Sequence, residues 1–149
     1  MRGRSVVALV VVAVSATAGL ASLAGSGLAA ETITAYVGDQ HVRAIDVGRR
    51  GPSAGDDLVV RGQLFADPER TSPLGLVRAS CERLDGDHLY CWNETTVDGR
   101  GEVISEGTQD LRVATFVDAI TGGTGDFATA RGTVDVDFAT GTLTIAVLD

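Results

Sequence analysis

The chain has 149 residues, which is enough for one domain with a buried core. It contains 12 Arg, no Lys and 20 Asp plus Glu, giving a formal net charge of −8 at pH 7. Nucleic acids and anionic membrane surfaces need a positively charged face, so neither is expected as a partner. The 19 glycines, together with the lack of a convincing 3.6-residue apolar period, favour an all-β chain with many turns.

Residues 1–30 have the features of a secretory signal peptide. Two arginines give a positive start, an apolar segment at 6–14 comes next, and small residues lead to a cleavage site after Ala29 or Ala30. The apolar segment is far shorter than the ~20 residues that a membrane-spanning helix needs. We therefore expect a secreted mature domain at 31–149 that has no membrane partner once the signal is removed.

Strand-like runs alternate with turn signals along the whole mature chain. Such a pattern indicates seven or eight short strands and is typical of a sandwich or a barrel. The runs, in chain order, are 33–37, 42–47, 57–65, 74–82, 88–97, 102–107, 112–120, 128–138 and 142–148.

The only two cysteines lie in two neighbouring runs that are expected to form a hairpin. With 85–87 as a three-residue loop, Cys81 faces Cys91 across the ladder, close enough for a disulfide. Oxidising conditions outside the cell would favour that bond. Two cysteines and two histidines at no zinc spacing give no support for a metal site or a catalytic thiol. We expect a Cys81–Cys91 disulfide, no metal and no cofactor.

The hairpin register also sorts the remaining side chains by face. Arg78 would oppose Glu94, and Ser80 would oppose Trp92. The face that carries the cysteines would also carry Val77, Ala79, Asn93 and Val97, which makes it mostly apolar with one amide.

A glycine-rich stretch at 121–125 joins two of the later runs. A phosphate-binding loop would need a third glycine where Ala128 stands, and a helix after it. The residues after Ala128 are β-branched and alternating instead, so we interpret the stretch as a turn between strands.

The segment Thr-Gly-Gly-Thr-Gly-Asp-Phe-Ala-Thr-Ala-Arg-Gly at 121–132 resembles the most distinctive segment of the allene oxide cyclase and dirigent barrel superfamily. Stretches at 55–59, 75–81 and 101–107 resemble strands of that family in the same order. The resemblance covers roughly Val42 to the C-terminus and is strongest to small secreted bacterial members. It implies an eight-stranded antiparallel β-barrel with an apolar cavity, usually assembled as a trimer.

The same resemblance suggests polar residues for the cavity. Allene oxide cyclases hold an unstable epoxide with a glutamate and an asparagine on the first long strand. In this chain the position of the glutamate is occupied by Ala44 and that of the asparagine by Asp46, so the glutamate is missing. The family also has a cavity asparagine on the second strand, and its position is occupied by Gln63 in this chain. Catalytic residues are not assigned. The ligand-binding residues expected are Asp46, Arg61, Gln63 and Asn93.

The orientation of Arg61 has two alternatives. Alignment with the family turns the odd-numbered residues of 59–65 inward, whereas apolar patterning turns the even-numbered residues of 58–64 inward. An inward Arg61 would need a buried partner, and Asp46 is the candidate; the pair would then hold a polar end of a ligand. An outward Arg61 would be a surface charge.

Three functions are compatible with these features. The first is a cyclase, isomerase or dirigent-type protein that steers a hydrophobic substrate by shape and proximity. The second is a binding protein with the same cavity and no turnover, and the third is a structural barrel with a filled interior. No nucleophile with an adjacent base is recognisable. The expected partner is a small hydrophobic molecule.

Overall fold

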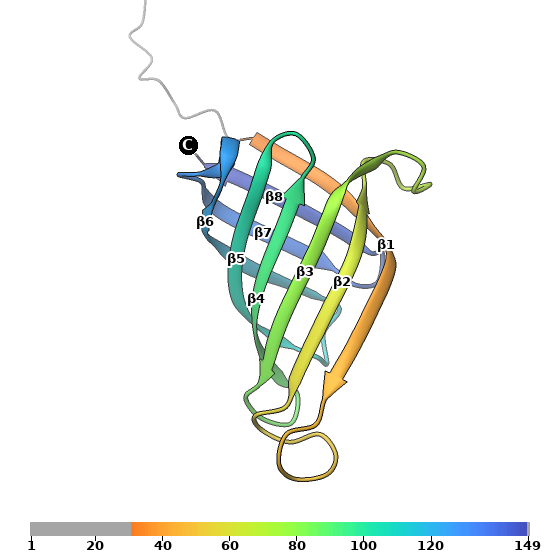
Figure 1. Cartoon of the computed structure of the whole chain (residues 1–149), viewed down its shortest axis with the longest axis vertical. Helices are drawn as coiled ribbons and strands as arrows, with labels where there is room; N and C mark the ends of the chain where they lie inside the picture. The colour runs from red at the N-terminus through yellow and green to blue at the C-terminus, as the bar shows by residue number, and fades with distance from the viewer. Residues whose placement is uncertain (1–30, 149) are drawn as a thin grey trace, which may run out of the picture.

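Eight antiparallel strands close into a barrel in which each strand pairs with its neighbours in the sequence and β8 pairs back to β1 (Figure 1). The computed structural model describes residues 31–148, so the signal peptide predicted at 1–30 lies outside the described residues. The predicted all-β, eight-stranded antiparallel barrel is confirmed. The strands are β1 (Glu31–Ile45), β2 (Asp57–Phe65), β3 (Pro73–Arg83), β4 (His88–Val97), β5 (Gly101–Asp110), β6 (Thr115–Gly123), β7 (Arg131–Asp137) and β8 (Thr142–Leu148).

The first strand differs from its prediction. The two runs expected at 33–37 and 42–47 are one strand, β1, with an irregularity in its register between Gly38 and His41. Asp39 has a left-handed backbone (φ 47°), which inserts a bulge and lets the strand bend and continue. At Gly38 an added Cβ would lie 2.8 Å from the Phe65 ring, so a larger residue there would require this ring to move.

One end of the barrel is closed by a packed apolar cluster. The 3₁₀ turn η1 (Gly125–Phe127) comes after β6, and the Phe127 ring is buried among residues of β4 to β8. Gly125 has a φ of +59°, and an added Cβ would lie 2.2 Å from the Arg100 carbonyl oxygen. The interpretation of the glycine-rich stretch as a turn is therefore confirmed: glycine allows two backbones to approach and folds Phe127 over the end of the barrel.

The other end of the barrel is split. β1 pairs with β8 only from Glu31 to Tyr36, although it continues beside β2 as far as Ile45. On the opposite side, the pairing of β5 with β6 ends at Glu106 and Ala119. Figure 1 shows the result: β1 to β4 reach the lower end of the view, while β7 and β8 cross behind the upper part.

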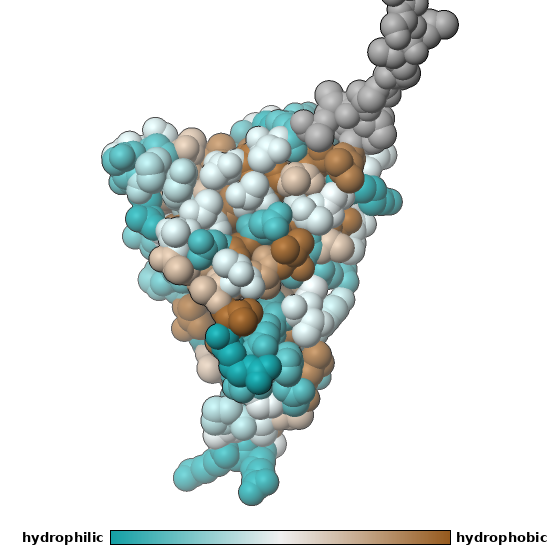
Figure 2. All heavy atoms as spheres, turned by 180° about the vertical axis from the view of Figure 1, so that it is seen from behind, coloured by the Kyte–Doolittle hydropathy of each residue, from teal (hydrophilic) through white to brown (hydrophobic). Residues whose placement is uncertain are grey.

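The outer surface does not form one continuous apolar face in the view from behind. Figure 2 shows hydrophobic groups in small clusters between hydrophilic ones, on a molecule that narrows toward its lower, hydrophilic end. Within residues 31–148, no helix is both long and apolar enough to span a membrane.

Candidate functional site in the barrel lumen

A cavity of about 150 Å³ lies inside the barrel. This volume matches that of an engineered apolar cavity that takes up benzene or xenon. Alternation along the strands sends one set of side chains into this space, and most of them are apolar. The principal apolar lining residues are Leu58, Val60, Val77, Leu89, Phe116, Val134 and Leu143.

The cavity reaches solvent at the split end of the barrel. Its lining includes Leu111, which is 46% exposed, and Phe138, which is 52% exposed. The ring of Phe138 packs on that of Phe116, with 5.1 Å between the centroids. Because the cluster around Phe127 closes the opposite end, a ligand would enter between the β5–β6 loop and the β7–β8 turn.

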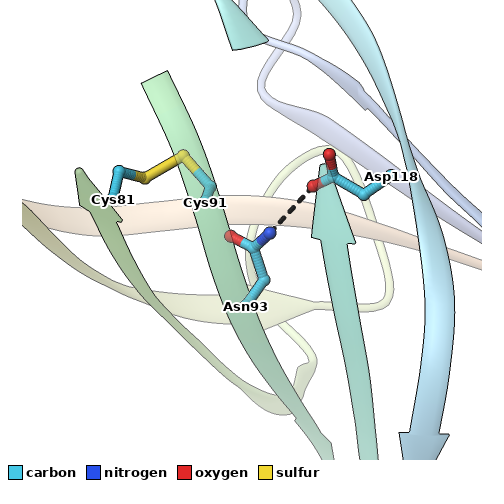
Figure 3. Close-up of a disulfide and its surroundings, with 4 residues drawn as sticks. All are labelled: Cys81, Cys91, Asn93 and Asp118. Atoms are coloured by element: carbon cyan, nitrogen blue, oxygen red, sulfur yellow. Dashed lines mark hydrogen bonds between the residues drawn. A yellow bond between two sulfur atoms is a disulfide. The ribbon is translucent and has the colours of Figure 1, made fainter. Parts of the chain in front are cut away.

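Four polar side chains form a cluster inside this apolar space. Asn93 comes from β4, Ser105 and Gln109 from β5, and Asp118 from β6. The Nδ2 atom of Asn93 donates a hydrogen bond to Oδ2 of Asp118 at 2.8 Å (Figure 3). Asp118 is 1% exposed, so a carboxyl group is buried in the wall of the lumen.

Burial changes the acidity of this carboxyl group. Loss of hydration raises the pKa of Asp118 to about 6, and the amides of Gln109 and Asn93 oppose the rise by favouring the charged form. The Oδ1 atom of Asp118 accepts no hydrogen bond of ordinary geometry, although Gln109 is near enough to influence the pKa. The hydroxyl of Ser105 is also buried without a partner. The cluster therefore has hydrogen-bonding capacity that the described residues do not use.

The predicted disulfide is confirmed and forms part of the same wall. Cys81 on β3 and Cys91 on β4 are a directly opposed pair, with 4.0 Å between their Cα atoms. Both are buried, and Figure 3 shows the bond close to Asn93 and Asp118. The other predicted pairs, Arg78 with Glu94 and Ser80 with Trp92, are also confirmed.

Of the four predicted ligand-binding residues, the lumen contains only Asn93. Asp46 lies in the loop after β1, where Oδ2 accepts a hydrogen bond from the Gly51 amide at 3.0 Å. Arg61 is exposed on the outer face, opposite His41 on β1, and so does not meet Asp46. Gln63 lies on the same outer face, and its Nε2 donates to the Gly75 carbonyl at 2.6 Å.

Apolar patterning was therefore the correct guide to β2. The lumen receives Leu58 and Val60, and Leu64 is fully buried. The alternative that took its register from the family resemblance is wrong for this strand, because it would place an unpaired guanidinium among apolar side chains.

Sequence reasoning missed Ser105, Gln109 and Asp118. A signal for Asp118 was present: it alternates with Phe116 and Ile120, so a strand places all three on one face. A charged residue on an apolar strand face is the pattern of a buried polar site. Among residues 31–148, no group of three His, Cys, Asp or Glu side chains is arranged to hold a metal ion.

The solved structures that resemble this barrel include a demethylase and a dirigent protein. A structure titled pyocyanin demethylase superposes with a TM-score of 0.70 at 24% identity, covering 78% of this chain and 99% of that one. The chain therefore shares its barrel fold with that protein. A pterocarpan synthase dirigent protein superposes with a TM-score of 0.60 at 18% identity, covering 91% of this chain and 96% of that one.

No protein-family model matches the sequence, and no curated protein matches it. Likeness at these identities establishes a dirigent-type barrel fold, and many activities share folds of this kind. A function for this dirigent-type barrel must therefore be argued from the lumen.

Proposed function

We propose that this protein binds a small hydrophobic molecule in the lumen of its barrel. The observation that carries the proposal is the cavity itself, which is lined by apolar side chains, holds one polar cluster and opens at one end. Ligand sites are commonly concave and apolar, with a few polar groups that fix the orientation of the ligand. The similar barrels of a pyocyanin demethylase and a pterocarpan synthase dirigent protein are consistent with ligand binding by this fold.

The cavity also argues against a purely structural role. A lumen that is lined by apolar side chains and open to solvent leaves apolar surface unburied, and a filled interior would gain the stability that burial of this surface gives. A barrel that acted only through its surface would gain stability from larger side chains at positions such as Ala79, which lines the lumen.

A second candidate function is catalysis in the same lumen, as an isomerase or cyclase. Asp118 favours it, because a carboxyl group with a pKa near 6 can exchange a proton near neutral pH. Allene oxide cyclisation itself is not supported, since Ala44 stands where the cyclases have a glutamate. Loss of turnover in Asp118→Asn, with binding of a neutral apolar ligand retained, would distinguish an enzyme from a carrier.

Export and assembly belong to the same proposal. The leader at 1–30 and the buried Cys81–Cys91 disulfide support secretion of the mature domain. Assembly as a trimer is implied by the resemblance alone. The mass of the mature domain in solution, measured by light scattering, tests it directly.

Untargeted mass spectrometry of small molecules that co-purify with the mature domain tests the proposed function. Two variants on β3 make a matched pair: Ala79→Phe fills the lumen, and Ser80→Phe places the same ring on the outer face. We expect hydrophobic molecules with the wild type and Ser80→Phe, but not with Ala79→Phe. Equal recovery from all three proteins would show that binding does not occur in the lumen.

A further inference from the structure

The lumen holds a carboxyl group without a counter-charge. Asp118 is the charged side chain of the buried cluster, and the polar groups around it on β4 and β5 are two amides and a hydroxyl. Its Oδ2 accepts a hydrogen bond from Asn93, whereas its Oδ1 accepts none of ordinary geometry and lies against the α-carbon of Gly107. No arginine is among the residues that line the cavity in the described part of the chain.

A buried anion of this kind is costly, and a cationic guest would remove the cost. An ionised carboxylate in an apolar environment is unfavourable unless it is paired and hydrogen-bonded. The overall charge points the same way: the mature domain carries 10 basic and 20 acidic residues, so its field attracts cations and repels anions. The Ser105 hydroxyl, which is also without a partner, is enclosed in the same part of the wall.

We propose that the lumen selects small hydrophobic cations, namely amines with an apolar body whose protonated nitrogen pairs with the carboxylate of Asp118. The selection rests on the proposed function, because it requires that the lumen admit a ligand. The apolar wall formed by residues such as Val60, Leu89 and Phe116 receives the body of the ligand, and Asn93 fixes the carboxylate from the other side.

Selection of this kind depends on pH. The groups that face Asp118 are neutral: Asn93 from β4, Ser105, Gly107 and Gln109 from β5, and Val134 from β7. The remaining titratable group in the lining is Asp137, which lies near the mouth. With a pKa of about 6, Asp118 is about one-tenth ionised at pH 5 and almost fully ionised at pH 7.5. Cation binding should therefore weaken about tenfold between these two conditions.

The test compares two probes of nearly equal size and shape, benzylamine and benzyl alcohol, by NMR titration of the mature domain. Benzylamine is a cation at both pH values, whereas benzyl alcohol is neutral. One ring with a short polar substituent suits a cavity of about 150 Å³. The variants are Asp118→Asn, which removes the buried charge, and Asp135→Asn, which removes a charge from the exposed face of β7.

For the wild type at pH 7.5 we expect benzylamine to bind at least tenfold more tightly than benzyl alcohol. The difference should shrink about tenfold at pH 5, disappear in Asp118→Asn, and persist in Asp135→Asn. If benzyl alcohol binds at least as tightly as benzylamine at pH 7.5, cation selection is wrong but binding in the lumen stands. If neither probe binds, the proposed function fails, and the cation selection that rests on it fails as well.

Discussion

The carboxylate of Asp118 on β6 lies against the α-carbon of Gly107 on β5. A Cβ added at Gly107 would be 2.0 Å from Oδ1 of Asp118, far closer than two such atoms can approach. The contact lies just beyond the point where the β5–β6 ladder stops, after Glu106 and Ala119. The absence of a side chain at Gly107 therefore makes room for the polar cluster of the lumen.

Gly107→Ala should displace the Asp118 side chain. Gly107 has no left-handed backbone, so the substitution acts through this contact and not through backbone strain. We expect loss of the Asn93–Asp118 hydrogen bond and a destabilisation of about 1–3 kcal/mol. The side-chain amide signals of Asn93 report on it by NMR. Gly122→Ala is the control, because an added Cβ there meets nothing within 4 Å. Unchanged Asn93 signals in Gly107→Ala would contradict the geometry.

Asp118 should make the protein less stable as the pH rises. Its pKa is raised from 3.8 to about 6, so the folded state holds the proton more tightly than the unfolded chain does. The resulting stabilisation is fully present only well below the unfolded pKa of 3.8 and is lost as the pH rises through 6. The shift corresponds to about 3 kcal/mol.

Urea unfolding at pH 4 and at pH 7 checks this effect in Asp118→Asn and the wild type. The free energy of unfolding of the variant, relative to the wild type, should increase by about 2 kcal/mol between the two pH values, because the carboxyl group of the unfolded chain is already partly ionised at pH 4. Asp135→Asn controls for the removal of one negative charge from an exposed position. A constant difference between Asp118→Asn and the wild type would show that Asp118 is not a desolvated acid.

Reduction of the Cys81–Cys91 disulfide should lower stability without changing the fold. The bond closes a loop with a sequence separation of 10. In the chain-entropy model such a loop contributes about 2–3 kcal/mol. Unfolding curves with and without a reductant should differ by that amount for the wild type and coincide for the double variant Cys81→Ala/Cys91→Ala. Coincident curves for the wild type would indicate that the disulfide does not form.

Arg100 should hold the start of β1 to the closed end of the barrel. It donates to Glu31 at 2.8 Å and to Asp126 at 3.0 Å, and its guanidinium lies 4.9 Å from the centre of the Phe127 ring. Because these ion pairs are partly exposed, Arg100→Gln should cost only about 1 kcal/mol. Hydrogen exchange should rise at Glu31 and around Phe127. The matched variant Arg78→Gln breaks the exposed pair with Glu94 and should leave exchange at both places unchanged.

Much of the barrel could be predicted because its strands follow local rules. The bounds expected for β2, β4 and β8 are those observed, since clear alternation or apolar runs end at turn signals in each case. The cysteine pairing followed from the symmetry of a hairpin about its loop. The continuity of β1 was missed because the bulge at the left-handed Asp39 interrupts the strand pattern and was interpreted as a break between two runs.

The candidate site was harder to predict because it depends on contacts between distant strands. Asn93 was placed correctly by the hairpin register alone. Asp118 is 25 residues away from its partner Asn93, and the opening between β5 and β6 that admits its carboxylate is a property of the closed barrel. Arg61 shows the opposite case, in which the local apolar alternation of β2 decided the orientation and the alignment with distant relatives did not.

The most direct test of ligand binding in the lumen is a titration of the methyl-labelled mature domain with toluene, monitored by NMR. We predict shifts at the methyl groups of Leu58, Val60 and Leu89, which line the cavity, and none at Val117, which is exposed on the outer face. Ala79→Phe should abolish the shifts, and Ser80→Phe should retain them. An absence of shifts at the lining methyl groups, or shifts confined to Val117 and its surroundings, would contradict a ligand-binding lumen.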